Sequence, residues 1–98
     1  MKDIFEKVVH RINVACANKC FQDFDISDLG FKKTDVDDGR LAHYVYNLVK
    51  DDNNKIVVDF RCYDQSGPFS MQPDMNKYSA KLIENGKITE THENSFED

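Results

Sequence analysis

The pattern of apolar positions changes once along the chain. From residue 3 to residue 21, apolar side chains recur every three or four positions and form one stripe on a helix. Asp3 followed by Glu6 has the spacing of a capping box at the start of this helix. After residue 30 the pattern becomes a two-residue alternation, which is typical of strands with one buried face. The sequence therefore predicts a helix over 3–21 followed by strands.

Two hairpins are expected in the second part of the chain. The first spans Leu41 to Asp64, where two runs rich in β-branched and aromatic residues flank a polar cluster. The second is centred on Asn85-Gly86, a pair that favours a type I′ turn. Between them, residues 65–76 contain Gly67-Pro68 and Pro73 and predict a long loop, whose apolar members Phe69, Met71 and Met75 are expected to fill the edge of the core. The expected strands cover residues 31–36, 40–50, 55–63, 77–84 and 87–93, and residues 94–98 form an acidic tail.

These elements predict the α+β class: a single domain with one amphipathic helix packed on an antiparallel sheet of four to five strands. A chain of 98 residues has enough apolar surface for one modest core. The order of the elements resembles the cystatin or monellin arrangement. This resemblance concerns element order alone and implies no function.

The turn of the first hairpin sets the faces of its two strands. A symmetric turn centred on Asp52-Asn53 predicts three facing pairs: Val49 with Ile56, Val45 with Phe60, and His43 with Cys62. The opposite face then carries aromatic and charged side chains, namely Tyr44, Tyr46, Asp59, Arg61 and Tyr63. Either loops of the chain cover this face or it binds a partner, since aromatic residues and Arg are enriched at interfaces. A slip of one residue in the pairing would exchange the faces.

The chain is acidic, with a net charge of −5 and thirteen Asp against five Glu. Asp favours turns, so this excess agrees with strands joined by loops. An acidic balance argues against direct nucleic-acid binding, because phosphate contacts require clustered Lys and Arg. It favours a basic protein partner. The acidic residues expected to contact that partner lie in or next to two turns: Asp35, Asp37 and Asp38 at one, Asp51 and Asp52 at the other.

The compartment follows from cysteine usage and hydropathy. Three cysteines, an odd number, argue against a secreted disulfide scaffold. No apolar run approaches the roughly 20 residues that cross a membrane, and charges interrupt the apolar clusters near the N-terminus. We therefore expect a soluble, cytoplasmic protein.

A metal site is the one enzyme-like arrangement to weigh. Cys16 and Cys20 share a helix face, and the expected register brings His43 next to Cys62, which would complete a Cys₃His set for Zn²⁺. The alternative is that these cysteines are buried as small apolar residues, which the absence of a C-x₂-C pair favours. Phosphate-binding loops and hydrolase motifs do not occur in the sequence. We expect no cofactor and no enzymatic activity.

In bulk the chain resembles toxin-neutralising immunity proteins and phage anti-defence proteins, including anti-CRISPR proteins: short, acidic and without catalytic motifs. The expected function is a non-enzymatic inhibitor that blocks a basic enzyme, one that processes nucleic acid. Two alternatives remain open. One is a homo-oligomeric or complex-subunit module that pairs through the tyrosine face or the 77–93 edge. The other is a small-ligand or metal-binding domain at the interface of helix and sheet.

Overall fold

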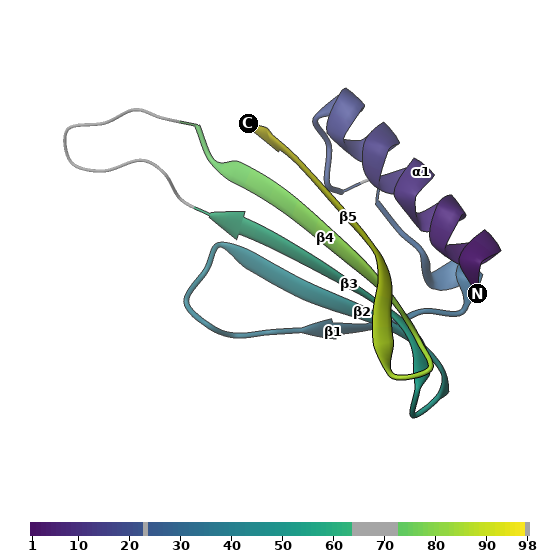
Figure 1. Cartoon of the computed structure of the whole chain (residues 1–98). Helices are drawn as coiled ribbons and strands as arrows, with labels where there is room; N and C mark the ends of the chain where they lie inside the picture. The colour runs from purple at the N-terminus through teal and green to yellow at the C-terminus, as the bar shows by residue number, and fades with distance from the viewer. Residues whose placement is uncertain (23, 64–72, 98) are drawn as a thin grey trace.

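The computed structural model describes the chain except for residues 23, 64–72 and 98 (Figure 1). It contains a helix, α1 (Lys2–Asn18), and a short 3₁₀ helix, η1 (Ser27–Leu29). The strands are β1 (Lys32–Asp35), β2 (Ala42–Asp51), β3 (Asn54–Tyr63), β4 (Met75–Glu84) and β5 (Lys87–Glu97). The predicted α+β class is confirmed: one N-terminal helix packs on a five-stranded antiparallel sheet.

The sheet is a meander in which each strand pairs with the next one along the chain, in the order β1-β2-β3-β4-β5. Its connections therefore lie at two opposite ends. One end holds the β1–β2 loop, and the other holds the β2–β3 and β4–β5 turns (Figure 1). β2 has ten residues, so at about 3.3 Å per residue the two ends lie about 30 Å apart.

α1 starts and ends differently from its prediction. The capping box is wrong: the helix begins at Lys2 without a side-chain cap, and Asp3 lies inside the first turn, where its charge suits the helix dipole. The helix ends at Asn18 because Lys19 takes a left-handed conformation with φ of 52°. The N–H groups of Lys19 and Cys20 then bond the carbonyls of Cys16 and Ala15. Within the part of the chain described, no helix has the length and apolar character needed to cross a membrane.

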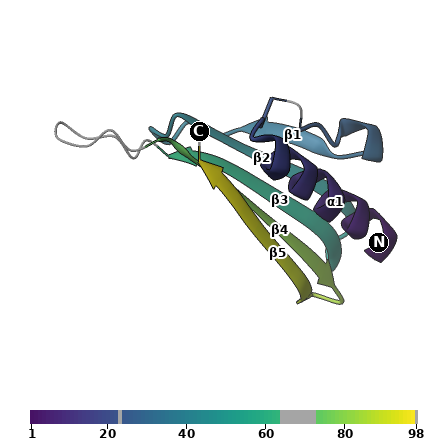
Figure 2. The same cartoon turned by 90° about the horizontal axis from the view of Figure 1, so that it is seen from above.

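The core lies between α1 and one face of the sheet (Figure 2). We call this face of the sheet the covered face. The predicted stripe on α1 supplies one side of the core, with Phe5, Val8, Ile12, Ala15 and Cys16 buried. β3 and β4 supply the other side of the core: Ile56, Val58, Phe60 and Cys62 from β3, and Tyr78, Ala80 and Leu82 from β4.

The register of the first hairpin is shifted by one residue from the prediction. At the turn Asp51 faces Asn54, as a symmetric turn requires, but a bulge between Val49 and Asp51 adds one residue to β2. Beyond the bulge the facing pairs are Leu48 with Ile56, Tyr44 with Phe60, and Ala42 with Cys62. The expected pairs of Val49, Val45 and His43 are therefore wrong, and the faces of β2 are exchanged.

The second hairpin follows its prediction near the turn. Asn85 and Gly86 both have positive φ, 54° and 77°, as a type I′ turn requires, and Ile83 faces Ile88. A symmetric turn at Asn85-Gly86 also predicts that Lys81 pairs with Glu90, but a second bulge shifts the pairing, so Lys81 faces Thr91 and this prediction is wrong.

The C-terminal segment is a strand where an acidic tail was expected. β5 continues to Glu97, and Phe96 faces Asn76 with 6% of its surface exposed. The apolar ring of Phe96 anchors the end of the strand in the core, which outweighs the polar residues around it. At the other end of the predicted loop, Met75 and Asn76 already belong to β4, whereas Phe69 and Met71 lie outside the described residues.

Candidate protein-binding face

The bulge in β2 moves two of the predicted contact tyrosines to the covered face. Tyr46 is 3% exposed, and burial raises the pKa of its phenol to about 12. Tyr44 is half-buried and stacks on Phe60 with ring centroids 5.7 Å apart, while the Lys33 amine lies 4.0 Å from its ring centre. The prediction that Tyr44 and Tyr46 share a face with Asp59 and Arg61 is wrong.

The opposite side of the sheet, which we call the open face, has no described helix over it. It carries every second residue of the middle strands: His43 to Val49 in β2, Lys55 to Tyr63 in β3, and Met75 to Ile83 in β4. Of these, His43 is buried, and the others are half-buried or exposed. Three residues predicted to contact a partner lie on this face: Asp59, Arg61 and Tyr63.

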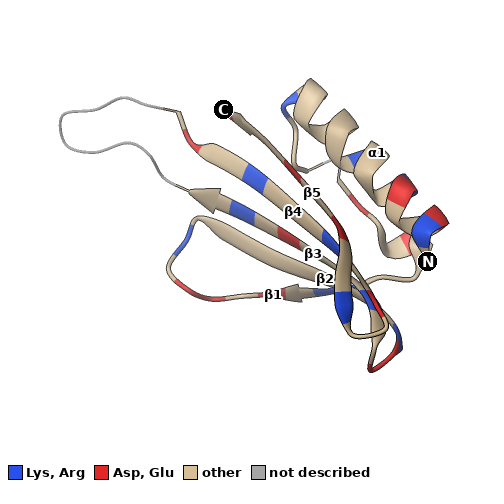
Figure 3. Ribbon diagram, viewed as in Figure 1, with Lys and Arg blue, Asp and Glu red and all other residues tan. Residues whose placement is uncertain are grey.

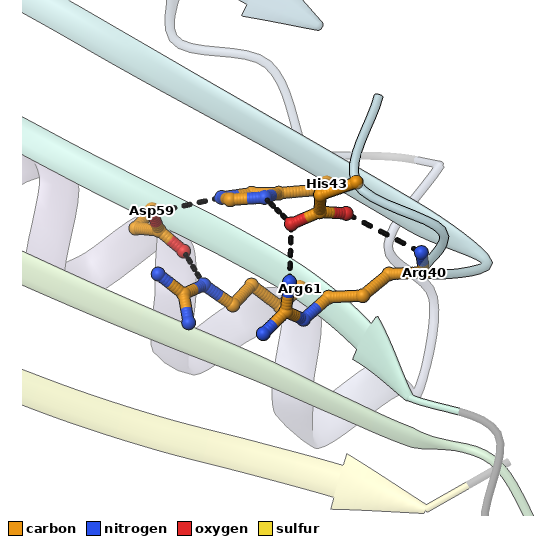
Figure 4. Close-up of polar contacts among 5 residues, drawn as sticks. Arg40, His43, Asp59 and Arg61 are labelled. Atoms are coloured by element: carbon orange, nitrogen blue, oxygen red, sulfur yellow. Dashed lines mark hydrogen bonds and ion pairs between the residues drawn. The ribbon is translucent and has the colours of Figure 1, made fainter. Parts of the chain in front are cut away.

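A cluster of charged side chains surrounds His43 on the open face (Figure 4). The imidazole Nδ1 lies 2.8 Å from a carboxylate oxygen of Asp38, and Nε2 lies 3.0 Å from an oxygen of Asp59. Arg40 pairs with Asp38, and the Arg61 Nε donates to the other oxygen of Asp59 at 2.7 Å. The cluster ties the β1–β2 loop to β2 and β3, so it fixes this end of the open face.

The geometry assigns a positive charge to His43. Ionised carboxylates accept hydrogen bonds and cannot donate, so both ring nitrogens must carry protons. The hydrogen bond to Asp59 raises the pKa of His43 most, with a further contribution from Asp38, while burial acts against them. The same contact with His43 lowers the pKa of Asp38. With 8% of its surface exposed, His43 lies between two carboxylates that favour its protonated form.

Tyr63 extends the cluster towards the end of β3. The Arg40 guanidinium lies 5.2 Å from its ring centre, and a hydrogen bond with Arg61 lowers the pKa of its hydroxyl. The same bond makes the largest contribution to the raised pKa of Arg61, ahead of Asp59. Tyr63 is thus the one predicted contact tyrosine that lies on the open face, and two guanidinium groups hold it there.

A shallow groove of about 260 Å³ runs along the open face beside this cluster. Its walls are Val57, Asp59, Arg61 and Tyr63 of β3, Lys77, Ser79 and Lys81 of β4, and Glu93 of β5. Within the described residues, neither Lys77 nor Lys81 forms an ion pair. The groove therefore presents two unneutralised ammonium groups beside a guanidinium.

The predicted acidic clusters lie apart and do not form one surface (Figure 3). Asp35, Asp37 and Asp38 are at the β1–β2 end of the sheet, whereas Asp51 and Asp52 are at the β2–β3 turn. Some of these carboxylates have structural roles. Asp38 and Asp51 each accept a hydrogen bond from the backbone N–H two residues on, at 3.3 Å and 2.8 Å, and so stabilise their own turns.

The residues considered for zinc are separated by the sheet. His43 lies on the open face, whereas Cys16 and Cys62 are buried on the helix side. No group of three or more His, Cys, Asp or Glu in the described ranges is placed to hold a metal ion, and none of the three cysteines forms a disulfide. Burial raises the pKa of the Cys16 thiol, which agrees with the alternative of a small apolar residue.

Sequence reasoning missed the His43 cluster because it depends on the bulge. With the symmetric register, His43 falls on the helix side, away from Asp59 and Arg61. The available signal is the spacing Asp38, Arg40, His43, which puts opposite charges close to the start of a strand whose neighbour carries the alternating pair Asp59 and Arg61. Comparison of the chain with family models, curated proteins and solved structures gives no match.

Proposed function

We propose that this chain is a non-enzymatic, cytoplasmic inhibitor that binds an enzyme acting on nucleic acid and blocks it with the open face of its sheet. The observation that carries the proposal is the side of the sheet over which none of the described elements lies. β3 presents half-buried Asp59, Arg61 and Tyr63 there, and β4 adds the exposed Lys77 and Lys81 around a groove of about 260 Å³. Such a surface resembles an interface before its partner is added, because interfaces combine aromatic residues and Arg with a polar rim.

The His43 cluster supports this use of the face. It holds Arg40, Arg61 and Tyr63 in place through hydrogen bonds and ring contacts before any partner arrives. Side chains fixed in advance lose less conformational entropy on binding than mobile ones. Arg and Tyr are also the residue types that most often contribute large binding energies.

The two acidic ends support a partner that is basic around its contact site. They lie about 30 Å apart, on either side of the open face, a span comparable to the width of a protein interface of ordinary size. An enzyme that binds nucleic acid carries Lys and Arg along the path of the phosphates. The acidic ends would contact this path and raise the rate of association.

Photo-crosslinking from two positions tests the proposal. A photo-reactive residue replaces Ser79 in the groove or, as the matched control, Ala17 on the exposed side of α1. Each protein is exposed to an extract of the native host, and the crosslinked protein is identified and purified. We expect the Ser79 position to crosslink one enzyme that acts on nucleic acid, and the purified inhibitor to reduce that enzyme's activity in proportion to its concentration.

Two results would overturn the proposal. One is a partner that crosslinks from Ala17 and not from Ser79, which would move the interface to the helix. The other is a partner that crosslinks from Ser79 but keeps full activity when saturated with this protein, which would make the chain an interaction module without an inhibitory role.

Self-association is a second candidate because apolar side chains gather at one end of the open face. Val49 and Ile88 are 61% and 55% exposed, and Val49, Lys55, Ile83 and Ile88 form one row across four strands. A second copy of the chain would bury this row. Light scattering of the purified protein decides between the candidates: a stable dimer, dissociated by Val49→Lys, would favour self-association.

A further inference from the structure

The open face is positively charged in a protein that is negatively charged as a whole. Around the groove, three cations (Arg61, Lys77 and Lys81) outnumber two carboxylates (Asp59 and Glu93), and beside it Arg40 and His43 pair with Asp38 of the β1–β2 loop. The net charge of the chain is −5. The surplus of negative charge therefore lies elsewhere, including the two acidic ends.

The charges of Lys77 and Lys81 at the centre are available to a partner. The two carboxylates of the cluster already share their oxygens among Arg40, His43 and Arg61. Lys77 and Lys81 have no carboxylate partner in the described part of the chain. They are four residues apart on β4, so their ammonium groups can reach two points about 13 Å apart on a facing surface.

We infer that the surface recognised by this protein has a cluster of carboxylates at its centre and basic residues on both sides. This inference rests on the proposed function and names the chemistry of the partner's site. The open face has the complementary order of charges, with acidic ends and a basic centre. A metal-dependent enzyme acting on nucleic acid has this arrangement, because carboxylates hold its Mg²⁺ ions inside a basic channel. The ammonium groups of Lys77 and Lys81 would pair with those carboxylates.

A nucleic acid is a poorer match to the same face. Its phosphates repeat every few ångströms and would continue past the groove onto the acidic ends. A compact carboxylate cluster can contact Lys77 and Lys81 without reaching the acidic ends.

NMR titration of the ¹⁵N-labelled full chain tests the inference with three synthetic probes at low salt. The probes are a hexa-aspartate peptide, a hexa-lysine peptide and a single-stranded 12-nucleotide DNA. We expect hexa-aspartate to shift the backbone amides of β3 and β4 around Arg61, Lys77 and Lys81. We expect hexa-lysine to shift the amides of the two acidic ends, near Asp37 and Asp52, and to leave the groove unchanged.

A pair of charge-matched variants makes the test specific. Lys77→Glu with Lys81→Glu should weaken hexa-aspartate binding at least tenfold. Lys7→Glu on α1 with Lys19→Glu just after its end changes the net charge equally and should alter the affinity less than twofold, because α1 covers the other side of the sheet. The amide spectra of both variants report directly whether each is folded.

Three outcomes would overturn the inference. The basic centre is not a recognition site if hexa-aspartate shifts no groove amide. The same conclusion follows if the control variant loses as much affinity for hexa-aspartate as the groove variant. DNA that shifts the groove amides at lower concentration than hexa-aspartate would assign the face to nucleic acid. If hexa-aspartate fails while Ser79 still crosslinks an inhibited enzyme, the carboxylate cluster is wrong and the proposed function stands. If Ser79 crosslinks no enzyme while hexa-aspartate binds, the proposed function is the part that is wrong.

Discussion

The two sides of β3 have opposite compositions within one strand. Ile56, Val58 and Phe60 point to α1 and are at most 2% exposed, whereas Val57, Asp59 and Arg61 point away and are half-buried. The covered side stabilises the fold through apolar burial. The other side has fixed ion pairs and partly exposed aliphatic groups. These groups contribute little to the free energy of folding and can contribute more to the free energy of binding a partner. The difference separates the residues that hold the fold together from those available for binding.

The sharpest way to test this comparison is to truncate both sides of β3. Phe60→Ala removes a ring that packs against Phe21, Tyr44 and Tyr78, and should lower the free energy of unfolding by about 3–5 kcal/mol. Val57→Ala, three residues earlier on the open face, should lower it by under about 1 kcal/mol. Urea denaturation with unchanged m values measures both. Equal losses would show that the open face is buried in the isolated protein.

A smaller effect is expected from pH, through His43. Its pKa is raised in the folded protein from the ordinary 6.5, so its stabilising effect is complete below pH 6.5 and is lost as the pH rises through the folded-state pKa. His43→Gln should lower the free energy of unfolding by about 1–3 kcal/mol at pH 6, in line with hydrogen bonds to charged groups. It should also remove this decline above pH 6.5. Denaturation curves from pH 6 to 9 measure it, with His10→Gln on the exposed side of α1 as the control.

A complementary change in stability at acidic pH is expected from Asp38. Because its pKa is lowered in the folded protein, its contribution is present above the ordinary pKa of 3.8 and is lost as the pH falls through the folded value. For His43, the contradicting result would be a free energy of unfolding of the wild-type protein that stays constant above pH 6.5.

Tyr78 on the covered face should respond in the opposite direction from an ordinary core residue. Its side chain is fully buried, and its hydroxyl has no hydrogen-bond partner among the described residues. Leaving such a group unpaired costs about 1–3 kcal/mol, so Tyr78→Phe should keep or raise the free energy of unfolding. Thermal unfolding followed by circular dichroism measures the change. A loss of about 1 kcal/mol would show that the hydroxyl is hydrogen-bonded in the core.

The smallest effect is expected from the groove lysines. Lys81→Gln removes a charge that forms no ion pair in the described part of the chain, so the free energy of unfolding should change by less than about 0.5 kcal/mol. The same substitution should weaken binding to the enzyme that crosslinks from Ser79.

Affinity for that enzyme should also fall as salt rises from low to high concentration, because ions screen surface charges. An affinity that is unchanged by Lys81→Gln and by salt would show that surface charge does not contribute to the interface.

The sequence predicted the elements whose signals are local. Three signals depend only on residues that are close together in the sequence: the stripe on α1, the alternation in β3 and the Asn85-Gly86 turn. The structure contains all three. The alternation in β3 also gave the correct covered face for Phe60 and its neighbours.

The faces of β2 were not predictable in the same way, since one bulged residue decides them. In β2, Tyr44 and Tyr46 lie on one face, and Val45 and Val49 lie on the other. Either face could therefore pack on the core, so the sequence pattern of β2 does not decide between them. Packing of Tyr46 on Phe24 and of Tyr44 on Phe60 favours the bulge, because rings bury more apolar surface than valines. The His43 cluster follows from that selection, which is why the candidate site was only partly visible in the sequence.

Solvent accessibility of two neighbouring methyl groups tests the central claim most directly. Val57 and Val58 are adjacent on β3 and face opposite sides, one half-buried on the open face and one fully buried under α1. A soluble gadolinium chelate should broaden the methyl signals of Val57 and spare those of Val58 in the free protein, and the bound enzyme should then protect Val57. Protection of Val57 in the isolated monomer, or continued broadening of Val57 in the complex, would contradict the account.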